Sequence, residues 1–275
     1  MSRLILNPKV HVIARTKVDV DALIDWAEDH GLRDVINTHG TPLNAIKHNL
    51  LDGNFDSIDL LPEIAGRYCY ASWAKGRDTE AYLANIIDSR HGSVLEHSNI
   101  SFAITGVSRS LTHEWIRHRV GMGVSQESQR YVDAKDMKFI IPPAVLPLLE
   151  SDEKYIQDWN MKAEGWVQDY VELQADLERF WSKKYKGFHL KKVVNEAARS
   201  QLPNAAETKM VWTGNLRCLR HVFEVRGSLH AEAEIRRLVL KMYEKVQHYQ
   251  VFADIQVLID AESCERYINV PFSKV

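Results

Sequence analysis

The chain has 275 residues, of which 45% are hydrophobic, so it can bury a substantial core. Its formal net charge is −2, which gives no overall basic surface for nucleic acid. The three cysteines, Cys69, Cys218 and Cys264, are odd in number and widely spaced, which favours a reducing compartment over a disulfide framework. No signal-peptide hydrophobic region opens the chain, and its most apolar run, 139–149, is too short to span a bilayer. We therefore expect a cytoplasmic protein with neither nucleic acid nor membrane as a partner.

The first hundred residues predict helices between two strands. The expected elements are a strand at 4–14, a helix at 20–30 that ends at Gly31, a surface excursion at 33–56 with a short helix near 43–48, helices at 57–73 and 79–90, and a strand at 98–105. Thr79 is the expected N-cap of the helix that it opens. Tyr68 is expected on the apolar face of the helix at 57–73.

The stretch 113–132 has the highest density of polar and charged groups. Leu111 and Trp115 recur at helical spacing, which predicts a short helix at 108–117. That helix leads into three adjacent side chains that can donate hydrogen bonds to phosphate or carbonyl oxygens, Arg117, His118 and Arg119.

Gly121 and Gly123 loosen the backbone after these side chains, and an extended segment is expected to follow. Alternation along a strand would point one amide, one hydroxyl and one guanidinium to the same face: Gln126, Ser128 and Arg130. These groups suit a base edge, a sugar and a phosphate, so the stretch predicts a nucleotide-sized site. The alternative is a solvated basic turn before a polar edge strand.

The second half of the chain is also mixed. The expected elements are two or more peripheral helices within 151–186, a helix at 193–201, a strand at 207–213, a helix after the N-cap Asn215, and an amphipathic helix at 231–246. The tryptophans of 151–186 are expected to be packing anchors. The pattern predicts the α+β class and a single domain over 1–275, with 150–186 as a helical elaboration.

No metal site is expected. His113 and His118 are five residues apart, and no cysteine partner or H-E-x-x-H spacing accompanies them.

The motif Arg117-His118-Arg119 followed by Ser128-Gln129-Arg130-Tyr131 resembles the signature of the flavin-dependent thymidylate synthases. The family signature has seven residues between the second Arg and the Ser, whereas eight lie between Arg119 and Ser128 here. We place the extra residue in the glycine loop 120–124, where an insertion costs little.

Three further segments extend the resemblance. His91-Gly92-Ser93-Val94-Leu95-Glu96-His97 is similar to a segment whose hydroxyl residue contacts flavin. Ala198-Arg199 with Leu202-Pro203 is similar to a segment whose Arg binds the substrate phosphate, and Asn215, Arg217, His221 and Arg226 keep the family's spacing on one helix. The family-like segments run from about 60 to 135 and from about 190 to 245.

The resemblance implies a central, largely antiparallel sheet flanked by helices. It also implies that dUMP is methylated to dTMP with FAD as cofactor, reduced by NADPH, and with methylenetetrahydrofolate as carbon donor. A homotetramer that shares its active sites between subunits is expected.

The implied roles divide into three sets. Arg226 and Ser128 are the expected catalytic residues. The expected FAD-binding residues are Ser93, Arg117, His118, Arg119, Gln126, Asn215, Arg217 and His221. The expected substrate-binding residues are Glu114, Arg117, Gln126, Glu127, Ser128, Gln129, Arg130, Arg199 and Arg226. Cys69 and Cys218 lie within helical patterns and are expected to be inert core thiols.

Three alternatives remain at this point. The first is a flavin reductase or oxidase without dUMP chemistry. The second is a non-catalytic nucleotide-binding or nucleic-acid-binding module, whose affinity would fall steeply with salt. The third is a family relative that kept the scaffold and lost the activity.

Overall fold

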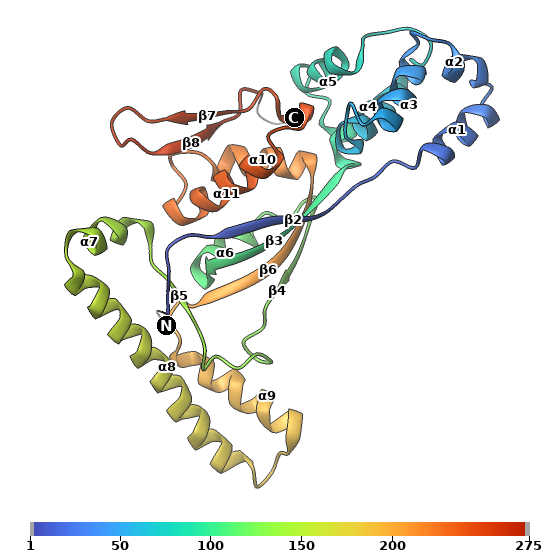
Figure 1. Cartoon of the computed structure of the whole chain (residues 1–275). Coiled ribbons are helices and arrows are strands. Elements are labelled where there is room, and N and C mark those ends of the chain that lie inside the picture. The colour runs from blue at the N-terminus through green and yellow to red at the C-terminus, as the bar shows by residue number, and fades with distance from the viewer. Residues whose placement is uncertain (1–2, 273–275) are drawn as a thin grey trace.

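The computed structural model describes residues 3–272. Within this range a four-stranded antiparallel sheet lies at the centre, between a helical lobe from the N-terminal part of the chain and a long helical arm (Figure 1). In spatial order its strands are β2 (Lys9–Arg15), β3 (Asn99–Ser108), β6 (Glu207–Asn215) and β4 (Met122–Gln126). This arrangement agrees with the α+β prediction.

One face of the sheet packs into the main hydrophobic core. Phe102 on β3 pairs in register with Trp212 on β6, and both side chains are fully buried. Among the elements that add to this core are three helices: α6 (Arg109–Trp115), α10 (Leu216–Arg226) and α11 (Ala233–Val246). Trp115 on α6 meets Trp212 edge to face at 5.5 Å. This contact fixes α6 on the sheet, and α6 is the helix that directly precedes the Arg-His-Arg stretch.

The N-terminal lobe is more helical than the sequence predicted. Its helices are α1 (Val20–Asp29), α2 (Arg33–Asn37), α3 (Pro42–Asp52), α4 (Ser57–Tyr70) and α5 (Thr79–Asp88), followed by the 3-10 helix η1 (Gly92–Glu96). The stretch 33–56 was expected to be mostly irregular, but Thr41 caps α3 and Pro42 occupies its first turn, where no N–H donor is needed.

Two details of this lobe differ from the predictions. The N-cap of α5 is Asp78, whose side chain accepts a hydrogen bond from the backbone N–H of Ala81, so Thr79 is already helical. Tyr68 is exposed, because α4 buries instead the side that carries the Glu63–Arg67 ion pair. Cys69, which was expected to be buried, is also exposed on this helix.

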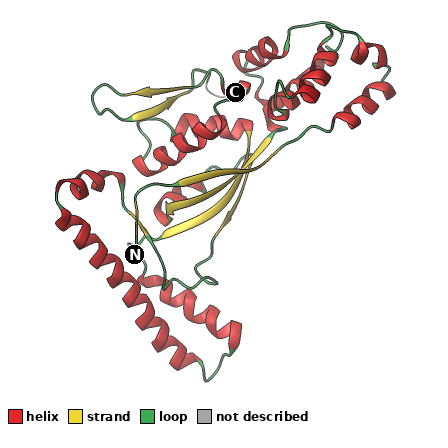
Figure 2. Cartoon of the chain, in the orientation of Figure 1, coloured by secondary structure: helices red, strands yellow, loops and turns green. Residues whose placement is uncertain are grey.

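The arm consists of η2 (Pro143–Val145), α7 (Leu146–Ser151), α8 (Glu153–Trp181), α9 (Gly187–Ala198) and η3 (Arg199–Gln201). The prediction of two or more helices within 151–186 was wrong, since α8 continues through Gly165 as one 29-residue helix (Figure 2). Trp166 packs on Phe139 and faces Trp159, which agrees with packing anchors.

Short elements complete the chain. β1 (Leu4–Ile5) pairs in parallel with β5 (Phe139–Ile140), and η4 (Gln250–Phe252) precedes a hairpin of β7 (Gln256–Ile259) and β8 (Arg266–Asn269). No helix within 3–272 has both the length and the apolar composition needed to cross a bilayer.

Candidate active site

Arg226 is the last residue of α10 and reaches across to α6. Its Nη1 donates a hydrogen bond to Oε2 of Glu114 at 2.7 Å, and its Nε donates one to Nε2 of His118 at 2.8 Å. The guanidinium is mostly buried, and charge-assisted hydrogen bonds of this kind are the strong ones. Residues 112 positions apart in the sequence therefore form one charged cluster.

The His118 ring is held neutral in this cluster. Burial, the largest cause, and the nearby positive charges of Arg226, His221 and Arg117 together lower its pKa to about 4. A neutral ring that accepts at Nε2 carries its proton on Nδ1. His118 thus offers one hydrogen-bond donor, Nδ1–H, away from Arg226.

We expect the His118 ring to titrate near pH 4, and its protonation to weaken the fold as the pH falls. The folded-state pKa lies below the unfolded value of about 6.5, so the unfolded chain takes up this proton first and stability declines from about pH 6.5 towards pH 4. Imidazole nitrogen shifts measured by NMR against pH would report the titration. In Arg226→Ala the midpoint should move upward, and an unmoved midpoint would contradict this account.

Ser93 and Arg217 line a second part of the site. They share a cavity of about 340 Å³ between α4, α5 and η1, which Cys69, Tyr70 and His91 also line. Arg217 forms an ion pair with Glu96 at 2.5 Å, and the His221 ring lies one helical turn further on, 5.7 Å from the ring of His118. The two predicted FAD-binding positions on α10 are thus exposed on one face, as the four-residue spacing indicated.

Asn215 holds the turn that carries Arg117 and Arg119. Its Oδ1 accepts a hydrogen bond from the backbone N–H of Cys218 at 2.8 Å, so it is the N-cap of α10, as predicted. Gly121, with a φ of +71°, lies so close that a Cβ there would come within 2.6 Å of the Asn215 Nδ2 atom. Only glycine allows this approach, and both arginine side chains remain exposed on the turn.

The glycine loop 120–124, where the extra residue of the Arg-His-Arg motif was expected, overlaps β4. The strand pairs with β6 in unbroken register from Met122 opposite Gly214 to Gln126 opposite Met210. The predicted loop 120–124 is therefore part strand, since residues 122–124 belong to β4. Val120 in this turn is 85% exposed.

The expected alternation of Gln126, Ser128 and Arg130 along a strand was wrong. β4 ends at Gln126, and a turn follows in which the Ser128 carbonyl accepts hydrogen bonds from the N–H groups of Tyr131 and Val132. Gln126 points inward, since its Nε2 donates to the hydroxyls of Thr112 and Thr208.

The neighbours of Gln126 are bound locally. Glu127 pairs with Lys209 at 3.3 Å, and the Ser128 hydroxyl accepts a hydrogen bond from the N–H of Arg130. Arg130 pairs with Glu196 on α9 at 3.1 Å, and the next residue, Tyr131, stacks on Phe188. The helical arm therefore holds this turn in place, and among residues 3–272 no hydrogen bond or ion pair joins Ser128 or Arg130 to Arg226.

Gln129 and Arg199 meet in a third part of the site, a cavity of about 430 Å³. Arg109 and His113, four residues apart on α6, line the same cavity. Burial and the positive charge of Arg199 both lower the pKa of Arg109. Two guanidinium groups that repel each other across one cavity favour the binding of a phosphate dianion, because its negative charge offsets the repulsion.

Sequence reasoning missed Arg109. It occupies the first turn of the predicted helix, four residues before His113 and five before Glu114. At 1.5 Å per residue, α6 separates Arg109 from Glu114 by roughly 7.5 Å along its axis. One short helix therefore connects the cavity of Arg109 and Arg199 to the Arg226 cluster, and the separation suits a nucleoside monophosphate.

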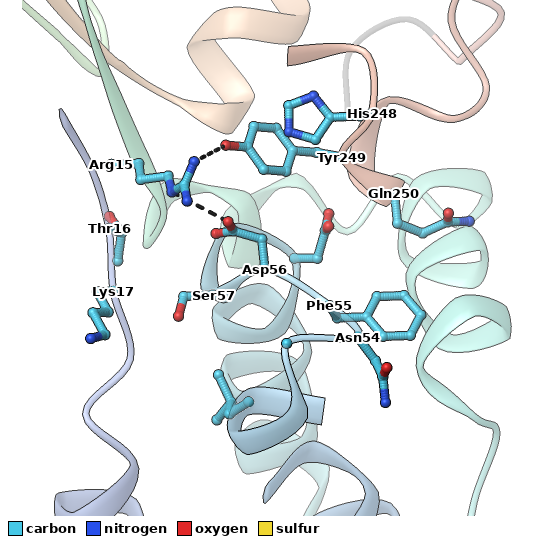
Figure 3. A pocket seen from close by; sticks show the side chains of 13 residues that line it. Arg15, Thr16, Lys17, Asn54, Phe55, Asp56, Ser57, His248, Tyr249 and Gln250 are labelled. Atoms are coloured by element: carbon cyan, nitrogen blue, oxygen red, sulfur yellow. Dashed lines mark hydrogen bonds and ion pairs between the residues drawn. The ribbon is translucent and has the colours of Figure 1, made fainter. Parts of the chain in front are cut away.

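A further cavity of about 790 Å³ lies elsewhere, between the end of β2, the start of α4 and η4 (Figure 3). In it Arg15 donates a hydrogen bond to the Tyr249 hydroxyl and forms an ion pair with Asp56. The residues that line it include none of the predicted site residues. Among residues 3–272 no group of three or more His, Cys, Asp or Glu side chains is arranged to hold a metal ion.

These features define a class: an α+β protein with an arginine-lined cavity next to a cationic surface on α10 and the turn at 116–121. Residues 50–249 match the family described as "Thymidylate synthase complementing protein". The chain is 43% identical over 216 residues to the flavin-dependent thymidylate synthase of Mycobacterium tuberculosis (strain ATCC 25618 / H37Rv). The aligned region covers 76% of this chain and 84% of that protein. It is 42% identical over 216 residues to the protein of the same name from Mycobacterium avium (strain 104), with the same coverage.

The chain belongs to the flavin-dependent thymidylate synthase family and is an enzyme. The match begins at residue 50, so α1, α2 and most of α3 precede it.

Proposed function

We propose that this chain converts dUMP to dTMP, with FAD as cofactor, NADPH as reductant and methylenetetrahydrofolate as carbon donor. In the balanced reaction dUMP, methylenetetrahydrofolate, NADPH and a proton give dTMP, tetrahydrofolate and NADP⁺. The observation that carries the proposal is the placement of Arg109 and Glu114 at the two ends of α6, one in the cavity that Arg199 also lines and one on Arg226.

Arg226 activates the uracil ring. Uracil C5 is a weak nucleophile, and negative charge that develops on the N3 and O4 side of the ring makes C5 more reactive. A preorganised guanidinium in a partly desolvated site stabilises that charge. Glu114 and His118 hold the guanidinium in place before the ring arrives.

A thiol does not supply this activation. Cys218 is buried, and burial raises the pKa of its thiol to about 11, so the thiolate is scarce at neutral pH. Cys69 and Cys264 are exposed, and neither lines the cavity that holds Arg109 and Arg199.

Arg109, Arg199 and Gln129 bind the phosphate of dUMP in the 430 Å³ cavity. Ser128, Glu127 and Arg130 also belong to the substrate site, although Arg130 is paired with Glu196 on the arm. We further propose a homotetramer that shares its active sites between subunits, and the lack of any hydrogen bond or ion pair from Ser128 or Arg130 to Arg226 within residues 3–272 supports it.

The donor set suits FAD, which carries two phosphates and a polar ring edge. Arg117, Arg119 and Arg217 supply positive charge, and Ser93 and His221 supply hydrogen-bonding groups beside them. Asn215 and Gln126 act by holding the Gly121 turn and α6, respectively. When bound, FAD carries the hydride that NADPH delivers. The Nδ1–H of His118 is free to donate a hydrogen bond to the cofactor.

We further propose that the chain acts as one domain with 150–186 as a helical elaboration, and that it works in the cytoplasm. The packing of Tyr170 on α8 against Ala134 and Ala198 supports one folding unit, because it ties the arm to the turn after β4.

The visible absorption spectrum of the purified protein, before and after addition of dUMP, tests the proposal. Flavin bands that shift with dUMP place both ligands in one site. Flavin bands that ignore dUMP would favour a reductase or oxidase instead. A protein that cannot be loaded with FAD would contradict the proposal altogether.

A further inference from the structure

Glu234 is a buried carboxylate that the proposed chemistry does not use. It lies in the first turn of α11 and is 9% exposed, and its partner Ser108 is 2% exposed. Oε1 accepts a hydrogen bond from the Ser108 backbone N–H at 2.8 Å, and Oε2 accepts one from the Ser108 hydroxyl at 2.7 Å. Burial raises the pKa of Glu234, and the two hydrogen bonds from Ser108 oppose that shift.

Ser108 is the N-cap of α6. Its Oγ accepts a hydrogen bond from the N–H of Leu111 at 3.0 Å while its own proton goes to Glu234. The carboxylate therefore fixes the cap by its backbone and its side chain together. An N-cap determines where a helix starts and at what angle it leaves the preceding strand.

The pair of helices α10 and α11 contacts α6 at both ends. Arg226, at the end of α10, binds Glu114 near the C-terminus of α6, and Glu234, at the start of α11, binds its N-cap. The connection between the two helices is fixed by Arg236, whose Nη1 donates to the carbonyls of Leu229 and Ala231. The two contacts therefore have a constant separation.

The two contacts differ in their exposure. The Glu234 contact is sealed from water, whereas Glu114 and Arg226 are partly exposed and must exchange partners when a uracil ring binds to the guanidinium. With the other end of α6 fixed, that exchange needs side-chain movement only, and Arg109 keeps its place in the phosphate cavity.

We propose that Glu234 is a positioning residue for the nucleotide: through Ser108 it fixes α6 and so sets the distance between the phosphate cavity and Arg226. This inference rests on the proposed binding of dUMP, and it gives Glu234 no contact with substrate or cofactor. It predicts a defect in nucleotide binding with flavin binding largely kept, because Ser93, Arg217 and His221 lie on η1 and α10, away from the N-cap of α6.

The test uses the FAD-loaded protein. In Glu234→Gln and in Ser108→Ala the KM for dUMP should rise about tenfold or more, since each loses a hydrogen bond to a charged group, while flavin content stays unchanged. Ser108→Thr keeps the hydroxyl and should restore the KM. The double variant should be no worse than the poorer single variant, because both changes break one contact. Glu244→Gln is the matched control, a glutamate on the same helix that pairs with Arg266 on the surface.

A wild-type KM in Glu234→Gln and Ser108→Ala would overturn the inference. Parallel loss of flavin, fold and dUMP binding in both variants would also overturn it, since that pattern marks a general structural role. If Glu234→Gln does not fold, the comparison of Ser108→Ala with Ser108→Thr decides the question. Failure of the wild-type protein itself to bind dUMP would instead refute the proposed function, which separates the two results.

Discussion

Arg226→Ala is expected to reduce thymidylate formation by about 10²–10³-fold while bound flavin is largely retained. The guanidinium is the preorganised donor for charge that develops on the uracil ring, and alanine leaves Glu114 without its buried partner. Because the effect belongs mainly to the transition state, it should appear in kcat more than in the KM for dUMP. Steady-state kinetics, together with the flavin absorbance of the purified variant, measure both quantities.

Two comparisons make this result specific. Arg226→Lys keeps the charge but cannot reproduce the two hydrogen bonds to Glu114 and His118, so it should recover little activity. Arg266→Ala removes an exposed arginine from the β8 strand and should leave the kinetics unchanged. Loss of flavin in Arg226→Ala would show that the residue serves the cofactor instead of the uracil ring.

Arg199→Ala is expected to raise the KM for dUMP by about 10–100-fold, which corresponds to the loss of a charge-assisted hydrogen bond to phosphate. Arg109→Ala should act in the same way, because both guanidinium groups face the same cavity. Deoxyuridine lacks the phosphate, so its weak turnover should be insensitive to either change. The ratio of kcat/KM for the two substrates therefore isolates the phosphate contribution.

Arg179→Ala is the control on the same helical arm, because its ion pair with Asp176 is fully at the surface. Equal losses with dUMP and deoxyuridine in Arg199→Ala would contradict the assignment. They would indicate that the change disturbs the arm and not the phosphate contact.

The elements of the central sheet were predictable because their signals are local. Ile100, Phe102 and Ile104 alternate with small or polar residues, and this pattern alone predicts β3. In the same way, the capping side chain of Asn215 predicts the start of α10. The end of β4 at Gln126 was not predictable, because β6 itself continues to Glu207 and the chain turns away only after the Glu127 N–H has donated to the Lys209 carbonyl. Pairing partners are remote in the sequence, and no local pattern records them.

The residues of the candidate site likewise divide into those that local sequence patterns predict and those that only tertiary contacts bring together. The spacing of Arg217 and His221 correctly predicted a shared helical face. Arg109 was missed because its importance comes from Arg199, ninety positions later, which lines the same cavity. The hydrogen bond between Arg226 and His118 likewise could not be predicted from the sequence, since tertiary packing alone brings α6 and α10 together. The exposure of Cys69 reflects which side of α4 the lobe covers, and Glu63 and Arg67 determine that side.

The turn at 116–121 and the strand β4 that follows it differ in how they would respond to a change in chain length. A residue gained or lost inside β4 would turn every later side chain of the strand to the opposite face, and Gln126 would leave Thr112 and Thr208. A residue gained in the turn at 116–121 leaves the strand register intact, as exposed Val120 illustrates. A change in chain length at Val120 would therefore preserve the pairing of β4 with β6, whereas the same change inside β4 would not.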